Sequence, residues 1–223
     1  AEVLSEQNRL KDVWVSVEQG IHNGQLIDGA LFGVANGPSA IMRSTDQFDY
    51  YSGGGADIAF LGAGEIDRLG NVNVSKLGQD VVGPGGFVDI SQGAKEVVFC
   101  GAFETDGLSV TAADGKLKIT RPGRISKIVE HVREVTFSGP AAAQRGQPVT
   151  YITERAVFRL TEDGTELTHL APGIDQERDV LSRMAFRPRI AKTLGLMDAS
   201  YFKGDPKDLN KSSCPTPVGT QNV

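Results

Sequence analysis

The sequence predicts an α/β domain whose second half consists of antiparallel strands, and three observations support that fold class. Apolar runs at residues 58–61 and 96–103 are typical of buried strands in an α/β sheet. From about residue 108 the pattern changes to strands around Asp-Gly pairs at 114–115 and 163–164, which is a strong hairpin signal. A chain of 223 residues is also long enough to bury a full hydrophobic core in one domain.

The N-terminal part of the chain predicts a strand with a carboxylate at its end. Residues 1–10 have the spacing of the end of an amphipathic helix. Residues 13–17, VWVSV, are mostly β-branched or aromatic and predict a strand buried on at least one face. Glu18 follows directly, before a turn that contains two glycines. Because ligands bind at the carboxyl ends of strands in open α/β sheets, Glu18 is a candidate functional residue.

The next part of the chain predicts a short helix and then a strand. The helix is expected over residues 46–51, and the three glycines at 53–55 end it. The continuous apolar run at 58–61 predicts a strand that is buried on both faces. Residues 65–78 predict a turn and a short alternating strand, and GPGGF at 83–87 interrupts two apolar stretches as a glycine-rich turn.

The second half predicts a buried strand followed by hairpins. Residues 96–103, EVVFCGAF, form the clearest buried strand of the sequence. Hairpins follow around the two Asp-Gly pairs, and a helix is expected near residues 176–184. The segment 204–223 is rich in Pro, Ser, Asn and Lys and predicts a flexible tail, so residues 1–203 are expected to form the folded domain.

The composition excludes several classes of function. A formal net charge of −5 and a pI near 5.3, without a run of Lys and Arg among aromatic residues, argue against nucleic-acid binding. Cys100 and Cys214 stand far apart without metal-binding spacing, which predicts neither a disulfide framework nor a zinc site and fits a reducing cytoplasm. The sequence has no apolar run of about 18 residues and no signal-peptide pattern, so it gives no support for a membrane protein or an exported one.

Two segments are candidates for chemistry. A carboxylate at a strand end beside glycines, as Glu18 is, can be partly desolvated and still reachable by a substrate, which a nucleophilic glutamate requires. The alternative is an ordinary surface or turn glutamate. The GPGGF segment can present successive N–H groups as an anion-binding nest or oxyanion hole, or it can be a tight turn. It matches neither the P-loop nor the GxGxxG pattern.

The remaining candidates are weaker. His22 lies close to Glu18 and is either a wall or substrate contact of the site or, as the sequence favours, a partly exposed loop residue. His131 and His169 fall in β-patterned segments and are expected to be structural. Gly54 and Gly55 either help to shape the pocket of Glu18 or end the helix before them.

Four ordered blocks span nearly the whole chain to about residue 200 and resemble one family. They read VEQGIHNG, QFDYYSGGGADIAFLGAGEIDRLGNVNVSKLG, GPGGFVDISQGAKEVVF and APGIDQERDVLSRMAFRP. Together they resemble the C-terminal, β-type half of the family I coenzyme A transferases, in particular the acetate, propionate and short-chain acyl-CoA transferases. The resemblance implies a NagB/RpiA/CoA-transferase-like fold, in which helices flank an open sheet, with antiparallel β-hairpins in the second half.

The resemblance also implies roles for the candidate residues. Glu18, in the E-x-G motif, would be the catalytic nucleophile and would form a covalent glutamyl-CoA thioester. Gly85 and Gly86 would form the oxyanion hole or contact the thioester. Contacts with substrate or coenzyme A are expected at Gly20, His22, Gly54, Gly55, Gly83 and Phe87.

The implied reaction needs no metal or redox cofactor, because coenzyme A is itself a substrate. The expected partners are an acyl-CoA, a carboxylic acid, an N-terminal α-type half that is either covalent or separate, and further copies in a homo-oligomer. The resemblance implies that the α-type half and the first strand of the β-type half are missing from the sequence, so this chain alone is expected to be an incomplete catalyst. His22 and Asn23 stand where many relatives have small or apolar residues, so the acyl specificity does not carry over.

Other classes of function remain open at this stage. An acyl-CoA hydrolase or a phosphosugar isomerase can share the fold. The isomerase would want basic residues for phosphate near the glycine loops, where the sequence has none, and the hydrolase would need no carboxylate acceptor. A non-catalytic subunit would keep the fold for association only, and the intact EQG and GPGGF segments argue against it.

Overall fold

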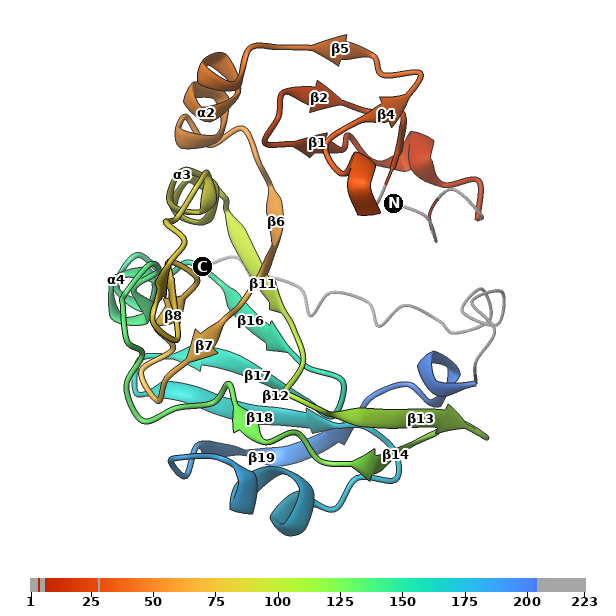
Figure 1. Cartoon of the computed structure of the whole chain (residues 1–223), viewed down its shortest axis with the longest axis vertical. Coiled ribbons are helices and arrows are strands. Elements are labelled where there is room, and N and C mark those ends of the chain that lie inside the picture. The colour runs from red at the N-terminus through yellow and green to blue at the C-terminus, as the bar shows by residue number, and fades with distance from the viewer. Residues whose placement is uncertain (1–3, 5–6, 28, 204–223) are drawn as a thin grey trace, which may run out of the picture.

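A mixed six-stranded sheet forms the body of the protein (Figure 1). The computed structural model describes Leu4 and residues 7–27 and 29–203. The strand order is β19-β18-β17-β16-β11-β6. Strands β6, β11 and β16 are parallel, β16, β17 and β18 are antiparallel, and β19 runs parallel to β18. The bounds are β6 Ile58–Gly62, β11 Glu96–Cys100, β16 Val149–Ile152, β17 Ala156–Thr161, β18 Gly164–Leu170 and β19 Arg189–Leu196.

Both predicted hairpins are present. Strands β17 and β18 form one of them inside the central sheet, and β13 (Ser109–Ala113) and β14 (Lys116–Arg121) form the other as a separate ribbon. Asp114 and Gly115 have φ values of 53° and 73°. Positive φ at both central residues is the geometry of the two-residue turn that matches the twist of the flanking strands, which is why Asp-Gly predicted this hairpin correctly.

An aromatic core lies between the sheet and two short helices, α3 (Phe87–Gly93) and α4 (Gly139–Gln144). Phe99 of β11 stacks on Phe87 of α3 on one side and on Tyr151 of β16 on the other, with ring centroids 5.7 and 5.5 Å apart. Strand β11 is therefore buried, as the sequence predicts. Helix α3, which begins at the last residue of GPGGF, was not expected from the sequence.

Strand β6 corrects one prediction. A strand at residues 58–61 is confirmed, but its burial on both faces is wrong, because burial alternates along β6 and the side chains of Ile58 and Phe60 are 44% and 67% exposed. The cause is its position, because β6 is the last strand of the sheet and pairs with β11 alone among the described strands. The apolar run therefore includes Ile58 and Phe60 on a sheet face that is exposed in this chain.

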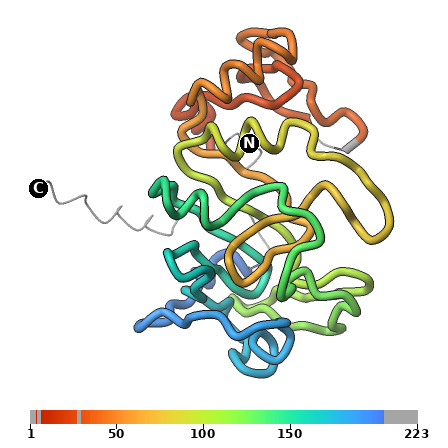
Figure 2. Tube along the Cα trace, turned by 90° about the vertical axis from the view of Figure 1, so that its left-hand side faces the viewer, coloured from red at the N-terminus to blue at the C-terminus, as the bar shows by residue number. Residues whose placement is uncertain are grey.

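The N-terminal lobe, residues 7–27 and 29–53, lies at one end of the molecule, as the red and orange segments of Figure 2 show. It holds a three-stranded sheet of β1, β2 and β5, a hairpin of β3 and β4, and the helix α2. Their bounds, with those of two 3-10 turns, are η1 Leu10–Asp12, β1 Ser16–Val17, β2 Ile21–His22, β3 Gln25–Leu26, η2 Gly29–Leu31, β4 Ala35–Asn36, β5 Ala40–Ile41 and α2 Ser44–Ser52.

Two expectations for this lobe change. The predicted buried strand at 13–17 is wrong, since only Ser16–Val17 is a strand and the side chains of Val13 and Trp14 are 41% and 63% exposed. The predicted helix at 46–51 is confirmed as α2, which begins two residues earlier and ends at Ser52, with Gly53 as its C-cap. Of the helix end expected over 1–10, residues 1–3, 5 and 6 lie outside the described residues, and residues 7–9 form a turn that leads into η1. The tail from residue 204 also lies outside the described residues.

Short elements connect the body. They are β7 Glu65–Ile66, β8 Val72–Asn73, β9 Lys76–Leu77, β10 Asp80–Val81, β12 Glu104–Thr105, β15 Ile125–Ser126, η3 Gln176–Val180, η4 Leu181–Arg183 and η5 Ala199–Phe202. The helix expected near 176–184 is one π turn, η3, followed by one 3-10 turn, η4. None of the described helices is long and apolar enough to cross a membrane.

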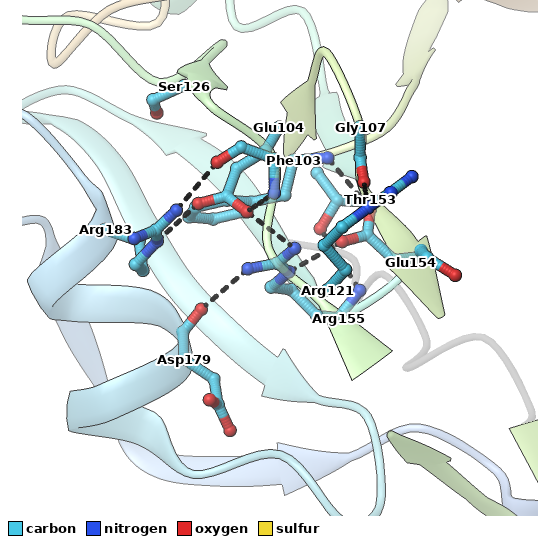
Figure 3. A network of polar contacts seen from close by, with 12 residues as sticks. Phe103, Glu104, Gly107, Arg121, Ser126, Thr153, Glu154, Arg155, Asp179 and Arg183 are labelled. Carbon is cyan, nitrogen blue, oxygen red and sulfur yellow. Dashed lines mark hydrogen bonds and ion pairs between the residues drawn. The ribbon is translucent and has the colours of Figure 1, made fainter. Parts of the chain in front are cut away.

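A buried ion-pair network ties these connections to the sheet (Figure 3). The Glu104 carboxylate, 1% exposed, binds the guanidinium groups of Arg155 and Arg183 and accepts a hydrogen bond from the Gly123 amide. Arg155 is fully buried, and it also binds Glu154 and donates to the Asp179 carbonyl oxygen at 3.0 Å. Each charge is paired, which offsets the large penalty for taking the groups out of water.

Removing one partner from this network should lower the free energy of unfolding much more than breaking an exposed ion pair. Arg155→Met leaves part of Glu104 unpaired in the interior, and we expect the free energy of unfolding to fall by about 3–5 kcal/mol. Arg124→Met breaks the exposed pair with Asp106 and should cost less than about 1 kcal/mol. Urea-induced unfolding of the two variants measures both values, and equal losses would contradict the assignment of the network as buried.

Candidate active site

Glu18 lies in the turn of a small hairpin rather than at the end of a strand of the central sheet. Strands β1 and β2 pair Val17 with Ile21, so Glu18, Gln19 and Gly20 form a three-residue turn between them. Gly20 has a φ of +95°, and the Gly20 amide donates to the Val17 carbonyl oxygen at 2.9 Å. A Cβ at this position would lie 2.1 Å from the Met42 carbonyl oxygen. The glycine of the E-x-G motif is therefore the residue that this turn needs.

The Glu18 carboxylate reaches the glycine-rich turn at 83–87, although the two segments are far apart in the sequence. Its Oε2 atom lies 2.7 Å from the point where a Cβ on Gly86 would stand, and the Phe48 ring of α2 approaches the same point to 2.4 Å. Gly86 has an ordinary φ of −80°. Glycine is therefore needed here for space rather than for an unusual backbone conformation.

The turn beside the carboxylate presents unused backbone donors. Gly83 and Gly85 have φ values of +83° and +55°, and positive φ at alternate residues turns neighbouring N–H groups toward one side as an anion-binding nest. The amides of Gly85 and Gly86 take part in no hydrogen bond found among the described residues. The arrangement can therefore offer N–H groups to an oxygen atom bound next to Glu18.

Tyr51 of α2 contacts β1, the strand that leads into the Glu18 turn. Its hydroxyl donates to Ser16 Oγ at 3.0 Å, two residues before Glu18. Burial raises the pKa of Tyr51 most strongly; the Ser16 and Gln47 side chains lower it, and the negative charge of Glu18 raises it further. The hydrogen bond to Ser16 places the phenol against the strand that leads into the Glu18 turn.

His22 and Phe87 are buried side chains. The prediction of a partly exposed loop for His22 is wrong, because it is 4% exposed in β2 and both of its ring nitrogens are bonded, Nδ1 to Trp14 and Nε2 to Gln47. Phe87 is 7% exposed and stacks in the core. Neither side chain is open to a substrate in this structure.

The other predicted glycines lie at turns. Gly20 shapes the Glu18 turn from within, whereas Gly54, with a φ of +83°, and Gly55 follow the end of α2. A Cβ on Gly55 would lie 2.5 Å from the Tyr50 ring, so this glycine is needed for packing. The placement of Gly54 and Gly55 therefore supports the helix-end interpretation that the sequence left open.

Two hollows occur in the described part of the chain, and the half-buried Glu18 lies outside both. One hollow of about 640 Å³ lies on the body, between β17, β18 and β19, and another of about 420 Å³ lies beside residues 10–15 and 23–25. Glu18 lines neither hollow. Among the described residues no group of His, Cys, Asp and Glu side chains has the arrangement of a metal site.

Sequence reasoning missed Gln47, Phe48 and Tyr51. All three belong to α2, and Gln47 and Tyr51 stand one helical turn apart, so they face the same side of the helix. Both are buried, at 0% and 4% exposure. Their spacing was a usable signal, but a polar residue at an inward position does not look like core in a single sequence.

Comparison with known proteins places this geometry in a family. The chain matches no family model. It is 44% identical over 200 residues to the acetate CoA-transferase YdiF of Escherichia coli O157:H7, an alignment that covers 90% of this chain and 38% of the relative. The crystal structure of that acyl-CoA transferase, as a thioester complex with CoA, superposes with a TM-score of 0.85 at 41% identity, over 93% of this chain and 39% of the other.

The chain belongs to the family I CoA-transferases. It has the CoA-transferase fold, α/β with a mixed central sheet and antiparallel hairpins. The caffeate CoA-transferase of Acetobacterium woodii is 39% identical over 91% of the chain and 39% of its own length. One subunit of the 3-oxoadipate CoA-transferase of Pseudomonas knackmussii is 28% identical over 68% of the chain and 56% of its own length. The chain thus spans about two fifths of the length of YdiF and of the caffeate enzyme.

The proximity of Tyr51 and Glu18 in this CoA-transferase chain can be tested by titration. Because the Glu18 charge raises the pKa of Tyr51, Glu18→Gln should lower that pKa. Nuclear magnetic resonance of ¹³C-labelled tyrosine follows the ionisation, with Tyr51→Phe to assign the signal. An unchanged Tyr51 titration would show that the two groups are not neighbours.

The same pKa shift has a consequence for stability. The folded-state pKa of Tyr51 lies above the ordinary tyrosine value of 10.0, so the folded protein holds this proton more tightly than the unfolded chain. The stability contributed by Tyr51 is therefore fully present below about pH 10 and is lost as the pH rises through the folded-state pKa.

Proposed function

We propose that this chain is the catalytic, β-type half of a CoA-transferase that moves coenzyme A between a short-chain acyl-CoA and a carboxylic acid, with Glu18 as the nucleophile. The observation that carries the proposal is the approach of the Glu18 carboxylate to Gly86. A half-buried carboxylate beside unused backbone N–H groups has what covalent catalysis on a thioester needs, namely a nucleophile and a place for an oxyanion.

The reaction follows from the chemistry of a carboxylate and a thioester. The Glu18 carboxylate attacks the acyl carbonyl carbon, the carbon–sulfur bond breaks, and CoA thiolate leaves a mixed anhydride. The thiolate then attacks the glutamyl carbonyl carbon, which releases the first acid as its carboxylate and leaves a glutamyl-CoA thioester. An incoming carboxylate repeats the two steps in reverse and leaves as the new acyl-CoA.

Each of these steps passes through a tetrahedral oxyanion. The amides of Gly85 and Gly86 are the proposed donors, because both are free of other described partners and Gly86 stands beside Glu18. Removing one such donor typically costs about 3 kcal/mol of transition-state stabilisation. Gly83, with its positive φ, shapes the same turn and is proposed to lie along the bound thioester.

The remaining walls of the site are proposed to come from the rest of the enzyme. The chain spans 38% of YdiF, and Glu18 lines neither of the two hollows described above. An anhydride must be kept from water if it is to be transferred rather than hydrolysed. The likeness to one subunit of the 3-oxoadipate enzyme supports an α-type half as the partner, either on the same polypeptide or separate. We propose acetate, propionate or a similar short acid as the acceptor.

Substitution of Glu18 tests the proposal directly. In the complete enzyme, Glu18→Gln should abolish CoA transfer because the amide cannot form the anhydride. Glu18→Asp should lower kcat roughly 100-fold because the carboxylate is withdrawn by one methylene. The readout is transfer between an acyl-CoA and acetate, together with hydroxylamine trapping of the glutamyl thioester. Full turnover with an unmodified residue 18 would refute the assignment, and turnover without any carboxylate acceptor would identify a hydrolase.

Gly86 provides a second test of the site, in which residue 18 itself is unchanged. Gly86→Ala puts a methyl group against Phe48 and the Glu18 carboxylate, and the displaced carboxylate should lower kcat roughly 100-fold. Gly62→Ala is the matched control, because a Cβ there meets open space at an ordinary φ. Steady-state transfer assays compare the two, and a Gly86→Ala enzyme as active as the control would contradict the proposed site.

A further inference from the structure

A chain of side-chain hydrogen bonds leads from the surface of the N-terminal lobe toward the Glu18 turn. The indole Nε1 of Trp14 donates to His22 Nδ1 at 2.8 Å, and His22 Nε2 lies 2.6 Å from Gln47 Oε1. Gln47 has no exposed surface, and its Nε2 atom is buried without a hydrogen-bond partner among the described residues. A buried polar nitrogen without a partner carries a free-energy cost, so its retention calls for an explanation.

The indole N–H at the start of this chain fixes the donor and acceptor roles of His22 and Gln47. An indole N–H can only donate, so His22 Nδ1 must be the accepting nitrogen. The neutral imidazole then carries its proton on Nε2, which donates to the Gln47 oxygen. If the Gln47 amide were flipped, its NH₂ group would face the N–H of His22 Nε2, and two donors would stand against each other. The NH₂ group of Gln47 therefore faces away from His22.

Tyr51 stands one helical turn after Gln47 on the same side of α2, and Glu18 follows the strand that the Tyr51 hydroxyl binds. Gln47 lies close enough to the Tyr51 hydroxyl to lower the pKa of the phenol, yet its Nε2 forms no hydrogen bond of normal geometry with any described residue. Glu18 acts on the same hydroxyl through its charge. In the free enzyme the hydroxyl donates to Ser16, in the strand that leads into the Glu18 turn.

We propose that Trp14, His22, Gln47 and Tyr51 form a one-way chain of donors that ends on the glutamyl carbonyl oxygen when Glu18 carries coenzyme A. Tyr51 is the catalytic residue of this chain, since its hydroxyl touches the reacting group. Gln47 and His22 are positioning residues that act through it. The inference rests on the proposed function of Glu18 and adds to it a side-chain donor.

Loading of Glu18 is the event that completes the chain. Thioester formation replaces the carboxylate charge by a neutral carbonyl, and the Tyr51 hydroxyl turns its proton from Ser16 to that oxygen. The Tyr51 oxygen then accepts from the free N–H of Gln47. Hydrogen bonds that run in one direction polarise one another, so each donor strengthens the next as the acceptor acid attacks and the oxyanion forms.

Tyr51→Phe in the complete enzyme is the primary test, because it removes one oxygen and keeps the ring. We expect the attack of acetate on the isolated glutamyl-CoA thioester to slow roughly 100-fold, as when one oxyanion donor is lost. The KM for acyl-CoA should stay within about two-fold, because the effect is on the transition state. Tyr50→Phe is the matched control on the same helix, since no described hydrogen bond uses its hydroxyl, and it should react at the wild-type rate.

Trp14→Phe tests the direction of the chain from its exposed start. Without the indole donor, His22 is free to move its proton to Nδ1 and the Gln47 amide is free to flip. We expect a several-fold slower thioester reaction and a change of the His22 tautomer in ¹⁵N magnetic resonance. Added to Tyr51→Phe, the Trp14 change should have no further effect, because both act through the same hydroxyl.

The outcomes separate this inference from the function on which it rests. If Glu18→Gln is inactive while Tyr51→Phe reacts at the wild-type rate, the donor chain is overturned and the nucleophile stands. Additive effects of Trp14→Phe and Tyr51→Phe would also overturn it. If Glu18→Gln retains full transfer activity, the proposed function itself fails.

Discussion

The contact between α2 and α3 is the constraint on which the candidate site depends. A Cβ on Gly93 would lie only 2.0 Å from the Tyr51 carbonyl oxygen, so the two helices meet backbone to backbone. This close approach, at the last residue of α3, seats the N-terminal lobe on the body. The Glu18 turn comes from the lobe and Gly86 comes from the body, and neither forms a site without the other.

The parts of the fold that the sequence predicted are those set by local chemistry. Asp114 and Gly115 specify their turn within four residues, and β11 is apolar enough to be buried wherever it stands. Strand β6 shows the limit, since its run of apolar residues cannot reveal that it is the last strand of the sheet. Helix α3 was missed because the glycines before it and the polar residues within it look like loop.

The site was predicted only in part, for a related reason. Glu18 and the 83–87 turn were identified from their motifs, and the structure brings them together. His22 looked accessible because it sits among loop residues, yet hydrogen bonds to Trp14 and Gln47 hold it inside. Such pairings join residues from different elements, and a single sequence does not reveal them. The contact of Gln47 with His22 is therefore visible only in the structure, where α2 packs against the sheet of β1, β2 and β5.

The open margin of the central sheet affects how this chain behaves on its own. The outer side of β6 has no strand partner among the described residues, and Ile58 and Phe60 are exposed beside it. Unpaired peptide groups next to apolar side chains are a template for adding foreign strands, which natural proteins normally shield. A preparation of residues 1–223 by itself is therefore prone to aggregate through this margin, and any handling of the isolated chain has to take its colloidal stability into account.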